Sequence, residues 1–208
     1  MRWMAAILIL PALSTAGDQG PVTLPAPHKT GGMRLMQALN ERKSTREFSA
    51  QKLTPQVLSD LLWAAWGVNR ADGRRTAPSA SNRQEIDIYV ASPDGLYLYQ
   101  AKEHRLQPIV PDDLRSVTGT QDYVKEAAIN LVYVADLAKM GNGSAESKTL
   151  YSGADTGFIS QNVYLFCASE GLVTVVRASI DRDALGKAMH LRPDQRIILS
   201  QSVGYPKK

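Results

Sequence analysis

Hydrophobic positions recur with helical spacing in four stretches, and these predict four helices. They cover residues 33–41, 54–67, 144–170 and 181–189. The second begins with Thr54 as N-cap and a proline at the first helical position, and it ends at a glycine. The third is the longest, and a glycine directly after it is the expected C-cap.

Other stretches predict strands. Residues 86–91 and 96–100 are separated by Ser-Pro-Asp-Gly, a turn typical of a hairpin, and residues 106–110 continue this meander. Three further apolar runs predict buried strands at 129–135, 172–178 and 196–203. The order is helices, a hairpin, then strand-helix-strand-helix-strand, which indicates an α+β fold with one central mixed sheet flanked by helices.

The N-terminus differs from the rest of the chain. Residues 1–16 combine an arginine, a short apolar run and a small-x-small ending, which is the pattern of a secretory signal peptide. We therefore expect an exported, periplasmic protein; the alternative is a retained hydrophobic N-terminus and a cytoplasmic protein. Residues 17–32 are rich in proline and glycine and predict an extended arm, which leaves 33–208 as the folded domain.

Composition narrows the possible functions. Hydrophobic residues make up 44% of the 208 residues, which excludes a disordered chain. The single cysteine, Cys167, excludes an internal disulfide framework and a cysteine-cluster metal site. A net charge of +4 fits a small anionic ligand such as a phosphate. There is no dense lysine or arginine run, so we expect no nucleic-acid partner, and the apolar N-terminal run is too short for a stable membrane anchor.

The sequence Arg-Lys-Ser-Thr-Arg at 42–46 is the first candidate for chemistry. Guanidinium groups and a serine hydroxyl satisfy phosphate oxygens well. The same residues also suit a solvated basic end of a helix.

Three further segments are weaker candidates when taken alone. Residues 78–84 form a polar loop whose hydroxyl and amide groups suit the edge of a heteroaromatic ring, or an ordinary turn before a strand. Residues 171–177 could present backbone N–H groups, or form only a buried strand. Residues 204–208 are a basic terminus or a frayed tail. No P-loop, His-Glu-x-x-His or dinucleotide-binding glycine motif occurs in the sequence.

Gly153 and Gly157 lie four residues apart in the longest predicted helix, with Ser160 near the same face. Small residues at this spacing allow another backbone to approach closely. The neighbour could be an element of the same chain or a second subunit.

Taken in order, these four segments resemble the FMN-dependent nitroreductase family, from about residue 35 to 207. R-K-S-T-R-E-F resembles the family's opening signature, and P-S-A-S-N-R-Q resembles its polar loop. The helix from G-A-D-T-G to S-E-G-L and the ending V-G-Y-P-K resemble its long helix and its terminal segment. The short chain is most similar to the branch that includes peptide azoline dehydrogenases.

The resemblance implies an interlocked homodimer with two FMN sites at the interface, and NADH or NADPH as electron donor. Arg42, Lys43 and Ser44 would hold the FMN phosphate and ribityl chain, and Arg46 would lie near the pyrimidine edge. Lys207 would close on the phosphate. Ser79 and Asn82 would come from the other subunit. The remaining implied contacts are the backbone of Thr174, Val175 and Val176 near flavin N5, and Gln121.

The chain departs from the family pattern at two places. Val175 and Val176 stand where many relatives have Glu-Gly near flavin N5, and Lys207-Lys208 replaces a terminal arginine. The resemblance implies ping-pong hydride transfer from NAD(P)H to a nitro compound, quinone or similar small acceptor, with no protein general base. The alternatives are a non-enzymatic FMN-binding protein and a flavin-dependent dehydrogenase of peptide heterocycles.

Overall fold

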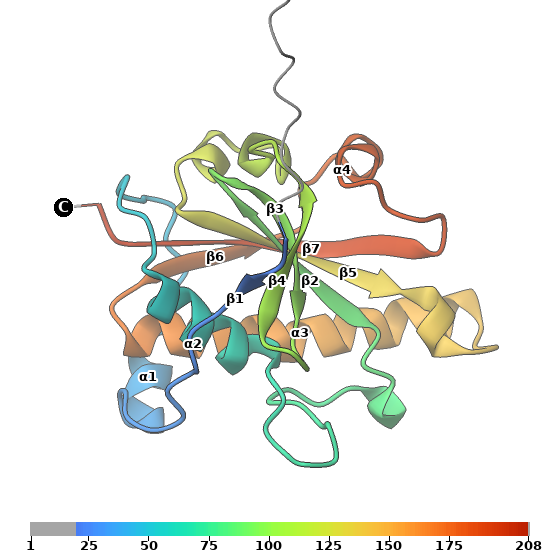
Figure 1. The fold of residues 1–208 in the computed structure, drawn as a ribbon, viewed down its shortest axis with the longest axis horizontal. Coiled ribbons are helices and arrows are strands. Elements are labelled where there is room, and N and C mark those ends of the chain that lie inside the picture. The colour runs from blue at the N-terminus through green and yellow to red at the C-terminus, as the bar shows by residue number, and fades with distance from the viewer. Residues whose placement is uncertain (1–19, 208) are drawn as a thin grey trace, which may run out of the picture.

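The computed structural model describes residues 20–207. The predicted signal peptide at 1–16 lies outside the described residues. The described chain forms one seven-stranded sheet with helices on both faces (Figure 1). This confirms the predicted α+β class.

The sheet has the strand order β1-β4-β3-β2-β5-β7-β6. All paired strands are antiparallel, so the sheet is antiparallel rather than mixed as the sequence predicted. An isolated parallel bridge joins Ser44, outside the strands, to Thr174. β7 lies between β5 and β6, so the connection through α3 skips one strand position. The strands are β1 (Val22–Thr23), β2 (Ile86–Ser92), β3 (Gly95–Gln100), β4 (Arg105–Val110), β5 (Ile129–Asp136), β6 (Val173–Arg177) and β7 (Gln195–Gly204).

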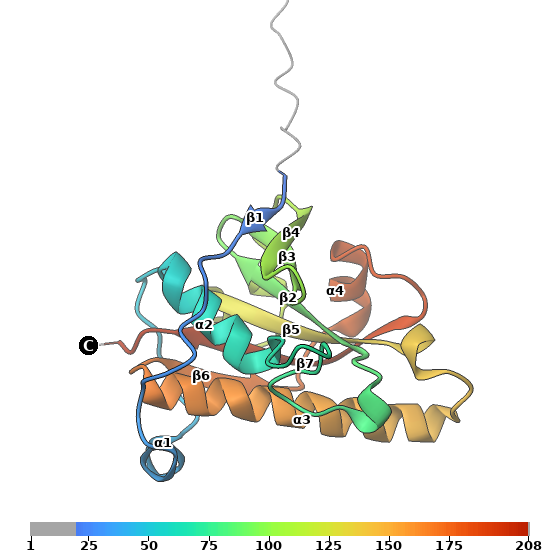
Figure 2. The same cartoon turned by 60° about the horizontal axis from the view of Figure 1, so that its bottom comes forward.

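Alternation along the central strands creates two apolar cores, one on each face of the sheet. On β5, Leu131 and Tyr133 face the core that contains α2 and α3, whereas Val132 and Val134 face the core beneath α4. Every residue of β5 is buried, as its apolar run predicts. Figure 2 shows α3 along one side of the sheet and α4 on the other.

The four helices begin and end close to the predicted positions. They are α1 (Leu35–Glu41), α2 (Pro55–Trp66), α3 (Ala145–Ser169) and α4 (Arg182–Ala188). The Thr54 side chain accepts a hydrogen bond from the Val57 N–H at the start of α2, as an N-cap should. Ser144 and Asp181 cap α3 and α4 in the same way. Short 3₁₀ turns cover 80–82, 115–117, 122–125 and 137–140.

The described part of the predicted arm is bound into the fold. Val22 and Thr23 pair with β4, and the Leu24 side chain is buried against the core. Further along, the His28 ring and backbone N–H both contact the Asp60 carboxylate of α2, at 3.0 and 2.7 Å. The sequence did not reveal β1, because a two-residue strand is too short to show alternation.

The two glycines of α3 face outward, whereas Ser160 is buried. A Cβ added at Gly153 or Gly157 would have no neighbour within 4 Å. The interpretation that an element of the same chain crosses α3 at these glycines is therefore wrong. On the same helix, Leu150, Tyr151 and Phe158 are exposed, and so are Leu35 and Met36 on α1.

Two negative findings apply to residues 20–207. None of their helices is long and apolar enough to cross a membrane. They also contain no group of three or more His, Cys, Asp or Glu side chains arranged to hold a metal ion.

Candidate functional site

The Arg-Lys-Ser-Thr-Arg segment follows directly after α1 and packs against α3 and β6. The Arg42 guanidinium lies over the Tyr164 ring of α3, 5.2 Å from its centroid. The Tyr164 hydroxyl contacts the Ser44 hydroxyl at 2.8 Å and accepts a hydrogen bond from the Val176 N–H at 3.0 Å. One tyrosine therefore joins two of the predicted segments.

Backbone pairing fixes the same arrangement and adds the C-terminal segment. The Thr45 N–H donates to the Thr174 carbonyl at 3.0 Å, and the Ser49 N–H donates to the Tyr205 carbonyl at 2.9 Å. Phe48 forms an antiparallel bridge with Pro206, the residue before Lys207. The structure thus brings the 42–49 segment together with two segments that lie more than a hundred residues further along the chain.

This region carries positive charge that no carboxylate neutralises. None of the ion pairs found within residues 20–207 uses Arg42, Lys43, Arg46 or Lys207. We call these four residues the cation cluster. Arg42 is half-buried and the other three are exposed. Positive groups of this kind, beside a serine hydroxyl, are suited to a phosphate.

The backbone of β6 has fewer free hydrogen-bonding groups for a ligand than the sequence suggested. The Thr174 carbonyl already accepts from Thr45, and the Val176 N–H already donates to Tyr164. A ligand at this edge of β6 would have to share or replace these two hydrogen bonds.

The polar loop at 78–84 forms a strained turn at a different place on the chain. Ser81, Asn82 and Gln84 have positive φ angles of 53°, 52° and 50°. Such left-handed conformations are costly for residues other than glycine and persist only where surrounding contacts hold them. Here the Gln84 N–H donates to the Ser79 hydroxyl at 3.0 Å, and the Arg75 Nε donates to the Gln84 Oε1 at 2.8 Å.

A buried carboxylate of α3 also holds this turn. The Ala80 N–H donates to Asp155 Oδ2 at 2.9 Å, and Asp155 is 2% exposed. The neighbouring Glu85 is fully buried, and neither of its carboxyl oxygens has a hydrogen-bond donor among the described residues. Burial, followed by contact with the Asp155 carboxyl, raises the pKa of Glu85 to about 7.

The Ser79–Asn82 turn and the cation cluster are distant from each other within one chain. The turn contacts α3 at Asp155, whereas Arg42 and Ser44 contact it at Tyr164. These nine positions correspond to roughly 14 Å along a helix axis. Figure 1 shows α1 and the C-terminus near one end of α3, and the loop before β2 under the other half.

Gln121 lies apart from both groups. It is next to the buried Arg177, and the Gln121 Oε1 and the Arg177 Nε both lack a hydrogen-bond partner among residues 20–207. The Arg177 side chain leaves β6 on the face opposite to that of Thr174, because side chains alternate along a strand. The structure therefore does not bring Gln121 to the Tyr164 contacts.

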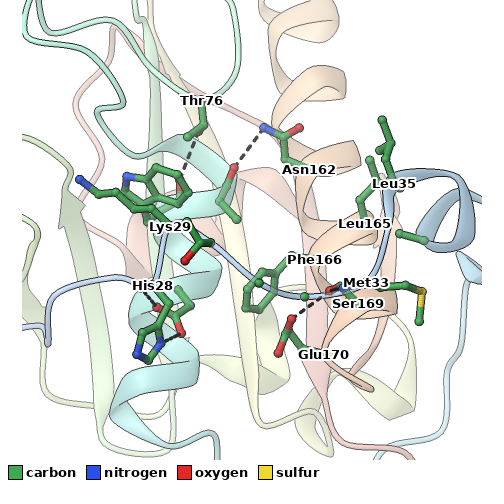
Figure 3. A pocket seen from close by; sticks show the side chains of 17 residues that line it. His28, Lys29, Met33, Leu35, Thr76, Asn162, Leu165, Phe166, Ser169 and Glu170 are labelled. Carbon is green, nitrogen blue, oxygen red and sulfur yellow. Dashed lines mark hydrogen bonds and ion pairs between the residues drawn. The ribbon is translucent and has the colours of Figure 1, made fainter.

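Within residues 20–207, one cavity lacks the predicted site residues and a smaller one includes two of them. The first, of about 520 Å³, lies between residues 28–33, α2 and α3, and Figure 3 shows the side chains that line it. Asn162 lies beside it and donates to the Ala64 carbonyl at 3.1 Å, which links α3 to α2. None of the eleven predicted site residues lines this cavity. A smaller hollow of about 260 Å³ is lined by Ser79 and Asn82, together with Arg70, Arg74 and Arg75.

Three residues that support the predicted segments were not identified from the sequence: Tyr164, Asp155 and Glu85. Tyr164 lies in an apolar run of α3, where nothing distinguishes it from a core residue. Asp155 did leave a signal, since it is an acid among small residues in the interior of the longest predicted helix. Glu85 directly precedes a buried strand and gives no such signal.

Comparison with known proteins gives matches in both sequence and structure. The model of the nitroreductase family matches residues 39–205. A candidate nitroreductase of Methanocaldococcus jannaschii is 30% identical over 169 residues, which cover 76% of this chain and 84% of that protein.

Solved structures share the whole fold. The crystal structure of a candidate nitroreductase from Ralstonia eutropha has a TM-score of 0.88 and 42% identity, and the match covers 100% of both chains. A structure from Staphylococcus epidermidis, described as an NAD(P)H:FMN oxidoreductase, has a TM-score of 0.66 and 14% identity, covering 88% of this chain and 92% of that one. At this identity the second likeness shows the fold alone.

Proposed function

Because the chain belongs to the nitroreductase family, we propose that it is an FMN-dependent oxidoreductase that transfers hydride from NADH or NADPH to a small acceptor such as a nitro compound or a quinone. The observation that carries this proposal is the cation cluster, whose four charges have no carboxylate partner in residues 20–207. Positive groups without an internal partner are available to an external anion. The S. epidermidis structure, whose name includes FMN, shares this fold.

The residues present fit a flavin nucleotide. Arg42 is held in place by the Tyr164 ring and Ser44 by the Tyr164 hydroxyl, so both are positioned before any ligand arrives. We assign Arg42, Lys43, Ser44 and Lys207 to the phosphate and ribityl chain. Fixed donors bind an anion more tightly than mobile ones, because less side-chain entropy is lost on binding.

The flavin supplies the redox chemistry when it is bound, accepting hydride from the nicotinamide and passing it to the acceptor. Arg46 would place a permanent positive charge at the pyrimidine edge, because a guanidinium does not deprotonate at physiological pH. The side chains of residues 174–176 carry no carboxyl, imidazole or thiol group, and the Tyr164 hydroxyl is engaged by Ser44 and Val176, so we assign no general base.

The second half of the site would come from another copy of the chain. Ser79 and Asn82 are roughly 14 Å from the Tyr164 contacts along α3 in one chain. We propose a homodimer in which the Ser79–Asn82 turn of one subunit meets the cation cluster of the other. The exposed apolar residues of α1 and α3 supply a surface for this contact: Leu35, Met36, Leu150, Tyr151 and Phe158 are 41–75% exposed.

A visible absorption spectrum followed through donor addition tests the function. The purified protein, supplied with FMN and freed of excess, should be yellow, lose its visible band with NADH or NADPH, and recover it when a nitroaromatic is added. Anaerobic conditions prevent oxygen from hiding the first step.

The same experiment separates the alternatives. A yellow protein that neither nicotinamide bleaches is a flavin-binding protein without this activity. A protein that retains no FMN contradicts the proposed function.

A further inference from the structure

The Ser79–Asn82 turn is strained, and a buried carboxylate supports it. Three of the six residues from Ser79 to Gln84 are left-handed, although none of them is glycine. The contact that ties the turn to α3 is the hydrogen bond from the Ala80 N–H to Asp155 Oδ2. The geometry of the turn therefore depends on the state of one buried carboxylate.

That carboxylate has a second acid against it. Glu85 is 0% exposed and Asp155 is 2% exposed. The turn that binds Asp155 through the Ala80 N–H leads directly into Glu85. Neither Glu85 oxygen has a hydrogen-bond donor among residues 20–207, and the Asp155 carboxyl is the side chain that raises the pKa of Glu85 further, after burial. Two carboxylates cannot hydrogen-bond, since both only accept, but a protonated carboxyl can donate to an ionised one. The pair is therefore compatible with the fold when it holds one proton.

We infer that Glu85 and Asp155 share one proton, and that this proton keeps the Ser79–Asn82 turn in the conformation that receives the ligand. Protonated Glu85 donates to one oxygen of Asp155, which leaves Asp155 Oδ2 free to accept from Ala80. When the proton leaves, two negative charges face each other without water, and one carboxylate must move toward solvent. The bond to Ala80 is then lost, and the strained turn relaxes. Glu85 and Asp155 are positioning residues in this account.

The charged surroundings do not remove the need for the proton. Arg83 on the turn is the cation that acts on Glu85, and its influence is smaller than the combined effects of burial and Asp155. On β5, the Asp136 carboxyl is turned away to Arg192 at 3.0 Å. The Glu85 backbone carbonyl is fixed by the Asp136 N–H at 2.9 Å, so Glu85 itself cannot easily withdraw.

The pH range follows from the raised pKa. Glu85 has an ordinary pKa of 4.5 and a folded-state pKa of about 7. The folded chain thus binds more protons than the unfolded chain between these values. The stability due to this proton is fully present below pH 4.5 and is lost as the pH rises through 7.

The inference rests on the proposed function only where it concerns FMN, so the test has two readouts. The first is hydrogen exchange at Ala80 without ligand, corrected for the intrinsic effect of pH. Wild-type protection should fall on the order of tenfold between pH 6 and pH 8, as expected for a group that titrates near 7. Glu85→Gln keeps a donor for Asp155 and has no proton to lose, so its protection should not change with pH.

The second readout is the FMN dissociation constant over the same pH range. Because the FMN phosphate titrates identically in every variant, the readout is the ratio of the wild-type dissociation constant to that of Glu85→Gln, and this ratio should rise on the order of tenfold between pH 6 and pH 8. The dissociation constant of Asp155→Asn, which keeps an acceptor for Ala80, should follow that of Glu85→Gln. Asp87→Asn is the matched control, because Asp87 lies on β2 two residues after Glu85 and its partly buried carboxylate contacts Lys139 instead; this variant should show the wild-type pH profile.

The outcomes separate the two claims. If wild type and Glu85→Gln have the same pH dependence in hydrogen exchange, the shared proton is overturned. If exchange behaves as expected but FMN binding does not follow it, the proton does not control the ligand. If no variant binds FMN while exchange follows the expected pattern, the proposed function fails and the proton-holding pair stands.

Discussion

At the scale of single residues, the site depends on which charges have internal partners. Asp113 and Arg115 form a close ion pair, and the pKa of Asp113 is lowered because the Arg115 side chain hydrogen-bonds it. Arg42 and Arg46 have no such partner among the described residues. The sequence predicted the cluster at 42–46 but not Tyr164, because a tyrosine within an apolar run has the pattern of a core residue.

The role of Arg46 is testable by truncation. Arg46→Ala should weaken FMN binding by about ten- to a hundredfold, the loss expected for one charge-assisted contact. Stability should change little, because Arg46 is exposed and makes no ion pair within residues 20–207. Arg196→Ala, an exposed arginine on β7, is the control for the lost charge. Equal FMN affinity in wild type and Arg46→Ala would remove Arg46 from the site.

At the scale of elements, local patterns with a physical cause predicted the structure well. The proline after Thr54, the hairpin turn before Gly95 and the apolar run of β5 each determine local geometry, and each appears where the sequence placed it. The left-handed residues of the Ser79–Asn82 turn were not predictable, because contacts from Asp155 and Arg75 hold them, and these are distant in sequence. The α-helical spacing of α3 was clear, but spacing alone does not identify its neighbours.

The hairpin turn gives a test at this scale. Gly95 has a φ of +132°, and an added Cβ would lie 2.7 Å from the Val110 carbonyl oxygen on the neighbouring strand. Gly95→Ala should lower the free energy of unfolding by about 2–4 kcal/mol, because backbone strain and a clash combine.

Gly73→Ala is the matched control for that substitution. Gly73 also has a positive φ, but an added Cβ would meet nothing within 4 Å. Its cost should be about 1 kcal/mol, from strain alone. The free energies of unfolding of both variants are measured by urea denaturation. If Gly95→Ala and Gly73→Ala lose the same free energy, the contact with Val110 has no effect on stability.

At the scale of the whole molecule, α3 holds the two halves of the proposed site apart. The sequence indicated which segments would bind the ligand. It did not indicate that the Ser79–Asn82 turn and the cation cluster are far apart within one chain, because their attachment to opposite halves of α3 sets that distance. The outward-facing Gly153 and Gly157 and the exposed Phe158 leave a surface on α3 that a second copy can cover.

Flavin stoichiometry in mixed dimers tests the shared site most directly. Arg46→Ala and Asn82→Ala each damage a different half, so each homodimer should bind FMN weakly at both sites. A dimer containing one chain of each kind would then have one site with both defects and one with neither. We expect one tightly bound FMN per mixed dimer, measured on a species of twice the 22.7 kDa of a single chain. Mixed dimers with no tight site, or a monomer that binds FMN tightly, would contradict the account.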